Sequence, residues 1–113
     1  MTATFDAHIP LFLRLVESSL RAGYNLAQSF NLAADEAAMP APASEQIRQV
    51  VADLKGGTAL PDALSAWLSR APGPNLDLVV ATIRVQLEVG GNLADKFQLL
   101  GQILQRRSLA PAV

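Results

Sequence analysis

The sequence predicts an all-α protein, an antiparallel six-helix bundle built from three helical hairpins. A pattern, L-x-x-G-x-x-L-x-x-x-[FL], occurs three times, with its glycines at Gly23, Gly57 and Gly90, which are 34 and 33 residues apart. Prolines recur at a similar interval. Apolar residues between these marks recur every three or four positions, which is typical of amphipathic helices. A constant period of this size indicates repeated units of supersecondary structure.

The first hairpin is predicted from helices at about 8–22 and 25–38. Pro10 suits a first helical turn, because proline lacks the N–H that has no partner there. Gly23 can end the first helix at positive φ, and Asn25, with a glutamine three residues later, can form a capping box on the second. The apolar positions are Ile9, Phe12, Leu13, Val16 and Leu20 in the first helix and Leu26, Phe30, Ala33 and Ala37 in the second.

The second hairpin is predicted from helices at about 42–55 and 59–70. The prolines of "MPAPAS" precede it. Gly57 marks the turn, and Thr58 is expected to cap the helix that follows, because a hydroxyl can accept a hydrogen bond from the first turn. The apolar positions are Ile47, Val50, Val51 and Leu54 in one helix and Leu60, Leu64, Trp67 and Leu68 in the other.

The third hairpin is predicted from helices at about 74–89 and 92–107. The prolines of "APGPNL" precede it. Gly90 or Gly91 is expected to take positive φ and end the first helix, and Asn92 then caps the second. The apolar positions are Leu76, Val79, Val80, Ile83 and Leu87 in one helix and Leu93, Phe97, Leu100 and Leu104 in the other.

Composition excludes several classes of function. The 113 residues carry nine basic and ten acidic side chains, interspersed along the chain, whereas nucleic-acid binders usually show a basic excess. Cysteine is absent and His8 is the only histidine, so a multi-histidine metal site cannot be built. His8 lies near a terminus, so a histidine–nucleophile relay is not expected either. In "LKGGT" Lys55 precedes the glycines, unlike a phosphate-binding loop. We therefore expect no enzyme activity, no cofactor and no nucleic-acid partner.

Two of the predicted helices carry more apolar residues than one buried face needs. The first adds Leu11 and Leu15, and the fifth adds Leu78, Val85 and Val89. One interpretation is that the fifth helix is central and buried on several sides. The other is that an exposed apolar stripe serves self-association or a partner, which predicts a homo-oligomer.

Three segments, "LRAGYNLAQSFNLAADEAAMPAP", "LKGGTALPDALSAWLSRAP" and "IRVQLEVGGNLADKFQLLGQILQRR", resemble the F-domain of inner-membrane platform proteins of type II secretion and type IV pilus systems. The likeness covers roughly residues 10 to 107 and is greatest to the Tad branch, the TadB-like proteins. The matching positions are Gly23 and Leu26; Gly57, Leu60, Ala63 and Leu64; and Gly90, Gly91, Asn92 and Leu93.

The resemblance implies that residues 1–113 form a single F-type cytoplasmic domain of a membrane-anchored parent protein. Such a domain lies at the cytoplasmic face of the bacterial inner membrane. It is a non-enzymatic scaffold that couples a secretion ATPase to assembly of a pilus or pseudopilus, together with other inner-membrane platform proteins. The sequence has no run of 18 uncharged apolar residues, so we expect an excised soluble domain whose transmembrane helices lie elsewhere in the parent.

A tetratricopeptide-like adaptor remains the alternative, because its period is also close to 34, although its glycine falls inside a helix. Three hairpins bring both termini and the proline-rich connections to one end of the bundle and the glycine turns to the other. We expect the terminal end, with Arg106 and Arg107, to face the anionic membrane. The expected contacts with the ATPase are the charges beside the glycine turns: Arg21, Lys55, Glu88 and Asp95.

Overall fold

The computed structural model describes residues 4–109 of the protein, and over this range the chain is entirely helical, without a strand. The predicted all-α class is therefore confirmed. The part of the chain described holds seven helices rather than six, because a short helix precedes the first predicted one. The helices are α1 (Thr4–Ala7), α2 (Ile9–Arg21), α3 (Leu26–Asp35), α4 (Ala41–Lys55), α5 (Leu60–Arg70), α6 (Pro74–Val89) and α7 (Leu93–Leu109).

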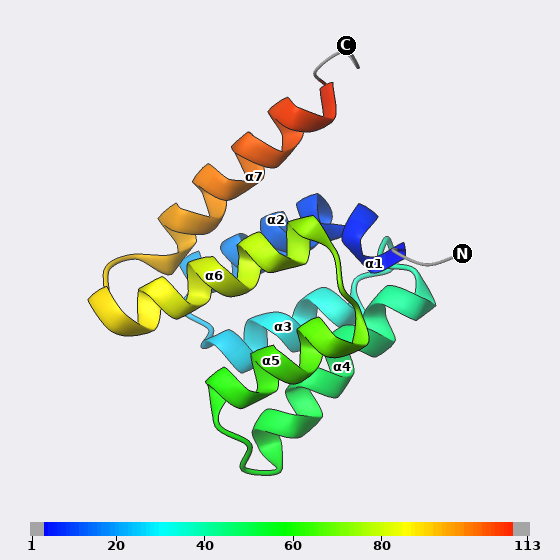
Figure 1. Ribbon diagram of the computed structural model, residues 1–113, viewed down its shortest axis with the longest axis vertical. Coiled ribbons are helices and arrows are strands. Elements are labelled where there is room, and N and C mark those ends of the chain that lie inside the picture. The colour runs from blue at the N-terminus through cyan, green and yellow to red at the C-terminus, as the bar shows by residue number, and fades with distance from the viewer. Residues whose placement is uncertain (1–3, 110–113) are drawn as a thin grey trace.

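The six longer helices form a closed circuit of neighbours. Each helix from α2 to α7 packs against the next one along the chain, and α7 returns to pack extensively against α2. Figure 1 shows successive long helices crossing the view in alternate directions, with the α2–α3, α4–α5 and α6–α7 turns toward the left and lower left. The longer connections, α3–α4 and α5–α6, lie toward the right, beside α1.

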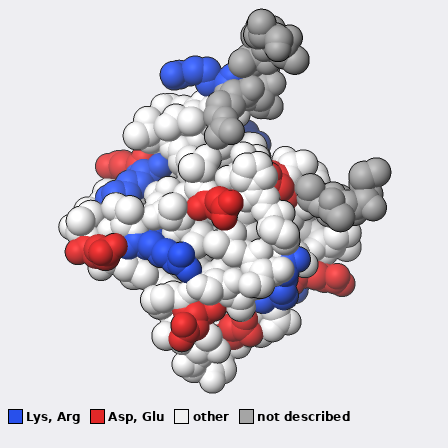
Figure 2. Space-filling model, viewed as in Figure 1, with Lys and Arg blue, Asp and Glu red and all other residues white. Residues whose placement is uncertain are grey.

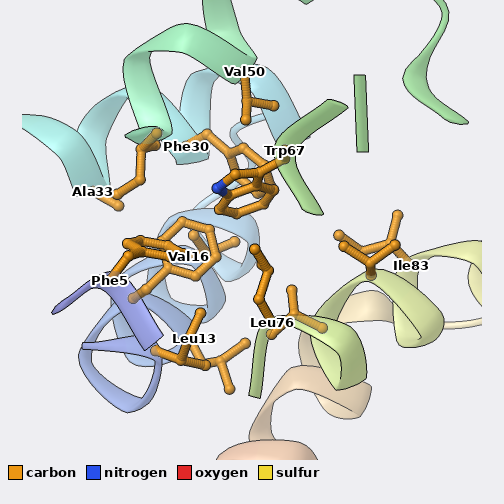
Figure 3. Packing of buried hydrophobic residues seen from close by; sticks show 14 of the residues in the cluster. Phe5, Leu13, Val16, Phe30, Ala33, Val50, Trp67, Leu76 and Ile83 are labelled. Atoms are coloured by element: carbon orange, nitrogen blue, oxygen red, sulfur yellow. The ribbon is translucent and has the colours of Figure 1, made fainter. Parts of the chain in front are cut away.

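The centre of the core is aromatic. Trp67 of α5 is fully buried, and its ring lies 5.6 Å from that of Phe12 and 5.7 Å from that of Phe30, in both cases edge to face. Figure 3 shows Trp67 reaching into the middle of the cluster, between helices that are far apart in sequence. Edge-to-face aromatic pairs stabilise a core beyond the area that they bury.

The additional helix, α1, closes one end of the core. Phe5 is only 3% exposed, and its ring centroid lies 5.3 Å from that of Trp67. Asp6 caps the distant helix α6: its carboxylate accepts hydrogen bonds from the backbone N–H groups of Leu76 (3.0 Å) and Asn75 (3.4 Å). A Cβ at Gly73 would collide with this carboxylate. The sequence prediction missed α1, because four residues are too few to show a helical period.

The predicted second helix, 25–38, ends early in the structure, at Asp35. Glu36 takes an extended backbone (φ −66°, ψ 132°), and Met39 turns inward and is 5% exposed. The residue before a proline is biased away from helix, and Pro40 follows directly. The connection is therefore longer than expected, and its methionine is part of the core.

The turns match the sequence prediction at two of three helix starts. Asn25 forms the full capping box, accepting from the N–H of Gln28 (2.8 Å) while its own N–H donates to the Gln28 side chain (2.9 Å). Asn92 Oδ1 accepts from the N–H of Asp95 at 3.0 Å. Thr58 does not cap α5: the N-cap residue is Ala59, without a side-chain hydrogen bond, so that prediction was wrong.

The expected positive-φ glycine is present in every turn. Gly23 and Gly57 have φ of 99°, and in the last turn both Gly90 (75°) and Gly91 (100°) are positive, where the sequence predicted one of the two. L-residues with a side chain rarely adopt this region, so each turn depends on its glycine. None of the helices within residues 4–109 is both long and apolar enough to cross a membrane.

Candidate interaction surfaces

The metal-ligating side chains among the described residues do not gather into a site. No group of three or more histidine and carboxylate side chains among them could hold a metal ion. His8 is half-buried between α1 and α2, where its backbone N–H donates to the carbonyl of Phe5 at 2.8 Å. On the face in Figure 2, acidic and basic side chains are interspersed rather than gathered into a basic patch. The candidate sites described below are exposed charges and hollows of the surface.

The turn-motif residues close the turns and anchor them to the core. The glycines supply the positive φ, while the residues that follow them point inward. Ala63 and Leu64 are fully buried, and Leu26, Leu60 and Leu93 pack against the core from partly buried positions. The roles of these residues in folding are enough to explain the repeated sequence pattern.

Two of the four predicted contact residues lie together. The guanidinium of Arg21, at the end of α2, pairs with Asp95 of α7 at 3.1 Å and with Glu17 at 2.9 Å, and donates to Gln98 at 3.2 Å. Hydrogen bonds to Glu17 and then Asp95 raise the pKa of Arg21 above its ordinary value. The Gly23 turn and the Gly90–Gly91 turn are thus joined through one arginine.

The other two predicted contact residues stand apart from this group. Lys55 ends α4 and Glu88 lies one residue before the end of α6, and both are exposed. Neither makes an ion pair within the described part of the chain. The four charges therefore do not form one site, although all of them lie beside glycine turns.

An apolar groove of about 330 Å³ runs between α6 and α7. Its α6 wall includes Leu78 and Val85, two members of the second stripe that the sequence predicted. Its α7 wall includes Leu99 and Ile103, which are 58% and 40% exposed. These two apolar positions were not predicted from the sequence, although their spacing of four residues on one helix face could have identified them.

A second hollow, of about 470 Å³, lies on the other flank of α7, against α2. Its floor includes Leu13, Phe97 and Gly101. Its rim is polar: Arg14 and Glu17 on α2, and Gln98, Gln102 and Gln105 on α7. The sequence analysis did not identify this hollow, since its residues come from the two ends of the chain.

A family model described as "Type II secretion system (T2SS), protein F" matches residues 12–110. The match includes α2 through α7 almost entirely, and so covers every glycine turn and both hollows. No curated protein and no solved structure matches the chain.

Proposed function

Because the chain belongs to the type II secretion system protein F family, we propose that it is a non-enzymatic scaffold domain of an inner-membrane platform protein. The observation that carries this proposal is the family match over residues 12–110. The family is a non-enzymatic membrane-platform family that belongs to inner-membrane machinery. The proposed place of this domain is the cytoplasmic face of that membrane, in a secretion or Tad pilus machine.

The proposed partners are a secretion ATPase, other inner-membrane platform proteins and further copies of the chain. We propose that the six longer helices act as three antiparallel hairpins within a single domain spanning 1–113. The packing of α2 on α3, α4 on α5 and α6 on α7 supports this interpretation. In this arrangement the glycine turns form the end that the ATPase reaches, and the end with Arg106 is nearer the membrane. The side chain of Arg107 lies outside the described residues.

The structure sharpens which charges can be tested at the glycine-turn end. Lys55 and Glu88 are exposed without an ion pair in the described chain, so reversing them changes the surface without breaking a contact. Arg21 and Asp95 pair with each other, so each must be changed alone and then exchanged. The exchanged variant, R21D with D95R, keeps opposite charges at these two positions while inverting the pattern that a partner meets. It also removes the ion pair between Arg21 and Glu17, so E17Q is made alongside it as a control for that loss.

The experiment is capture of the cognate ATPase by the immobilised chain. We expect K55E, E88K and the exchanged pair together to lower binding by about tenfold or more, since charge complementarity governs such contacts. The melting temperature should hardly change, because exposed charges contribute little to stability. The matched control reverses Glu45 and Asp77, two exposed acids near the starts of α4 and α6, at the opposite end. Loss of binding only in the control would show that the proposed orientation is backwards.

A further inference from the structure

Gly101 is the one glycine whose role the described chain does not explain. Gly23, Gly57, Gly90 and Gly91 have positive φ, and Gly73 makes room for Asp6. Gly56 is the C-cap of α4, where a Cβ would lie only 3.3 Å from the carbonyl oxygen of Ala52. Gly101 lies in the middle of the 17-residue helix α7, and a Cβ there would meet no atom within 4 Å. Glycine at such a position destabilises a helix relative to alanine. The reason for a glycine at position 101 therefore lies outside this chain's own packing.

The surroundings of Gly101 fit a close approach by another polypeptide. It forms part of the floor of the 470 Å³ hollow between α2 and α7, beneath a rim of three glutamines. A glutamine amide both donates and accepts hydrogen bonds, so it can pair with a copy of itself. Arg14 and Glu17 lie three residues apart on the α2 rim, and Arg14 makes no ion pair within the described residues. Glu17 pairs with Arg21 of its own helix through one carboxylate oxygen, Oε2. Opposite charges on one rim can pair reciprocally across a twofold axis.

The register of α2 and α7 allows a single twofold axis to satisfy all of these groups. Arg21 near the end of α2 faces Asp95 near the start of α7, so the two helices run in opposite directions. Moving about six residues along each helix from this pair, at about 1.5 Å per residue, reaches the midpoint between Arg14 and Glu17 on α2. On α7 the same step reaches Gly101 and Gln102. The two midpoints are therefore level with each other.

We propose that the α2–α7 face binds the same face of a second copy of this chain, with the twofold axis crossing both helices at that level. Arg14 then faces Glu17 of the second copy, and Gln98 faces Gln105. Gln102 lies over Gly101 of the second copy, which gives the glycine its use. The α6–α7 groove shows no comparable reciprocal charge pattern, so it serves as the comparison surface in the test.

The first experiment is sedimentation equilibrium of the 113-residue chain from low to high micromolar concentration. The wild-type chain is expected to form a dimer. G101L should weaken the dimer by about tenfold or more, because a side chain there holds the copies apart. At low concentration the same substitution should raise the melting temperature by roughly 3–6 °C, because it improves helix propensity in open space. L99Q, on the other flank of α7, is the matched control and should leave the dimer unchanged.

The second experiment tests whether the partner is another copy. R14E alone and E17R alone should each weaken the dimer by about tenfold or more, since like charges then face one another. An equimolar mixture of the two should associate again, because both cross-interface contacts pair opposite charges in the mixed dimer. Recovery in the mixture cannot come from a change of fold within either variant.

The outcomes separate this inference, which deepens the self-association proposed above, from the scaffold role itself. A wild-type chain that stays monomeric at high micromolar concentration overturns the α2–α7 dimer, and so does a dimer that L99Q disrupts and G101L does not. Failure of the mixture to associate overturns it as well. ATPase capture by a monomeric chain would leave the scaffold role standing, whereas an intact dimer without ATPase capture would leave the interface standing and remove that role.

Discussion

The part of the molecule built by α1 to α5 differs from the α6–α7 pair in how it uses its apolar residues. The first part places the aromatic rings of Phe5, Phe12, Phe30 and Trp67 in mutual contact at the centre of the core. The α6–α7 pair contributes aliphatic residues and Phe97 to that core. It also carries most of the large exposed hydrophobic side chains found in the described chain: Val85, Leu87, Val89, Leu99 and Ile103.

This difference shows that one helix can contribute to the core and to two separate surfaces at once. α7 buries Phe97, Leu100 and Leu104, while one flank lines an apolar groove and the other a polar hollow. The first part of the molecule contributes to the hollows described above only through α2, which lines the polar one. We therefore expect substitutions in the buried core of α1 to α5 to affect stability, and those on the flanks of α7 and on the facing rim of α2 to affect association.

The largest effect should follow from Trp67→Ala. Removing this fully buried ring leaves a cavity beside Phe5, Phe12 and Phe30, and such truncations destabilise by about 3–5 kcal/mol. Urea unfolding followed by far-ultraviolet circular dichroism measures the loss. A change below about 1 kcal/mol would mean that the aromatic cluster is not the centre of stability, and the comparison would fail.

A smaller loss is expected for Gly57→Val in the α4–α5 turn. The φ of 99° is unfavourable for a β-branched residue, although the space around it is open, so the loss should be about 1–3 kcal/mol. Thermal melts of the two proteins measure it. Gly101→Ala is the matched control in the other region and should stabilise the chain by up to about 1 kcal/mol. Equal effects of the two substitutions would contradict this reading of the glycines.

A still smaller loss of stability is expected for Asp6→Ala. It removes the carboxylate that accepts from the N–H groups of Leu76 and Asn75, and loss of a helix cap destabilises by about 0.5–2 kcal/mol. Asp6→Asn keeps one side-chain oxygen and should lose less. Denaturant unfolding of both variants measures the difference. If the alanine variant is as stable as wild type, α1 does not secure the start of α6.

The smallest effect on folding is expected for Ile103→Gln on the apolar flank of α7. The side chain is 40% exposed and lines the α6–α7 groove, so the free energy of unfolding should change by no more than about 0.5 kcal/mol. Chemical denaturation at low protein concentration tests this. A loss comparable with that of Trp67→Ala would place the groove in the core and remove the distinction between the two regions.

Much of the local structure could be predicted from the sequence, because its signals are local. The glycines that end α2, α4 and α6 could be assigned from two local signals. One is the end of a helical apolar period, and the other is the rule that glycine readily takes positive φ. The Asn25 capping box could be predicted for the same reason, because its two residues lie three positions apart. Thr58 was assigned as a cap on residue type alone, but its backbone N–H donates to Asp53 within a turn and α5 begins two residues later.

The long-range features could not be predicted in this way. The cap that Asp6 places on α6 joins residues about seventy positions apart, and nothing near either one signals the other. The polar hollow depends on α7 lying against α2, which a repeat of three similar units does not specify. Leu99 and Ile103 stayed unnoticed because the core positions of α7 already accounted for its helical period.

The pairing of α2 with α7 also governs the time at which this chain can finish folding. During synthesis α2 emerges first of the long helices and α7 last, because translation runs from the N-terminus. Until α7 is available, the side of α2 that includes Leu13 stays open to water. Contacts between such distant segments form slowly, since a long loop must close first. A nascent or shortened chain that lacks α7 would therefore present this apolar face to chaperones.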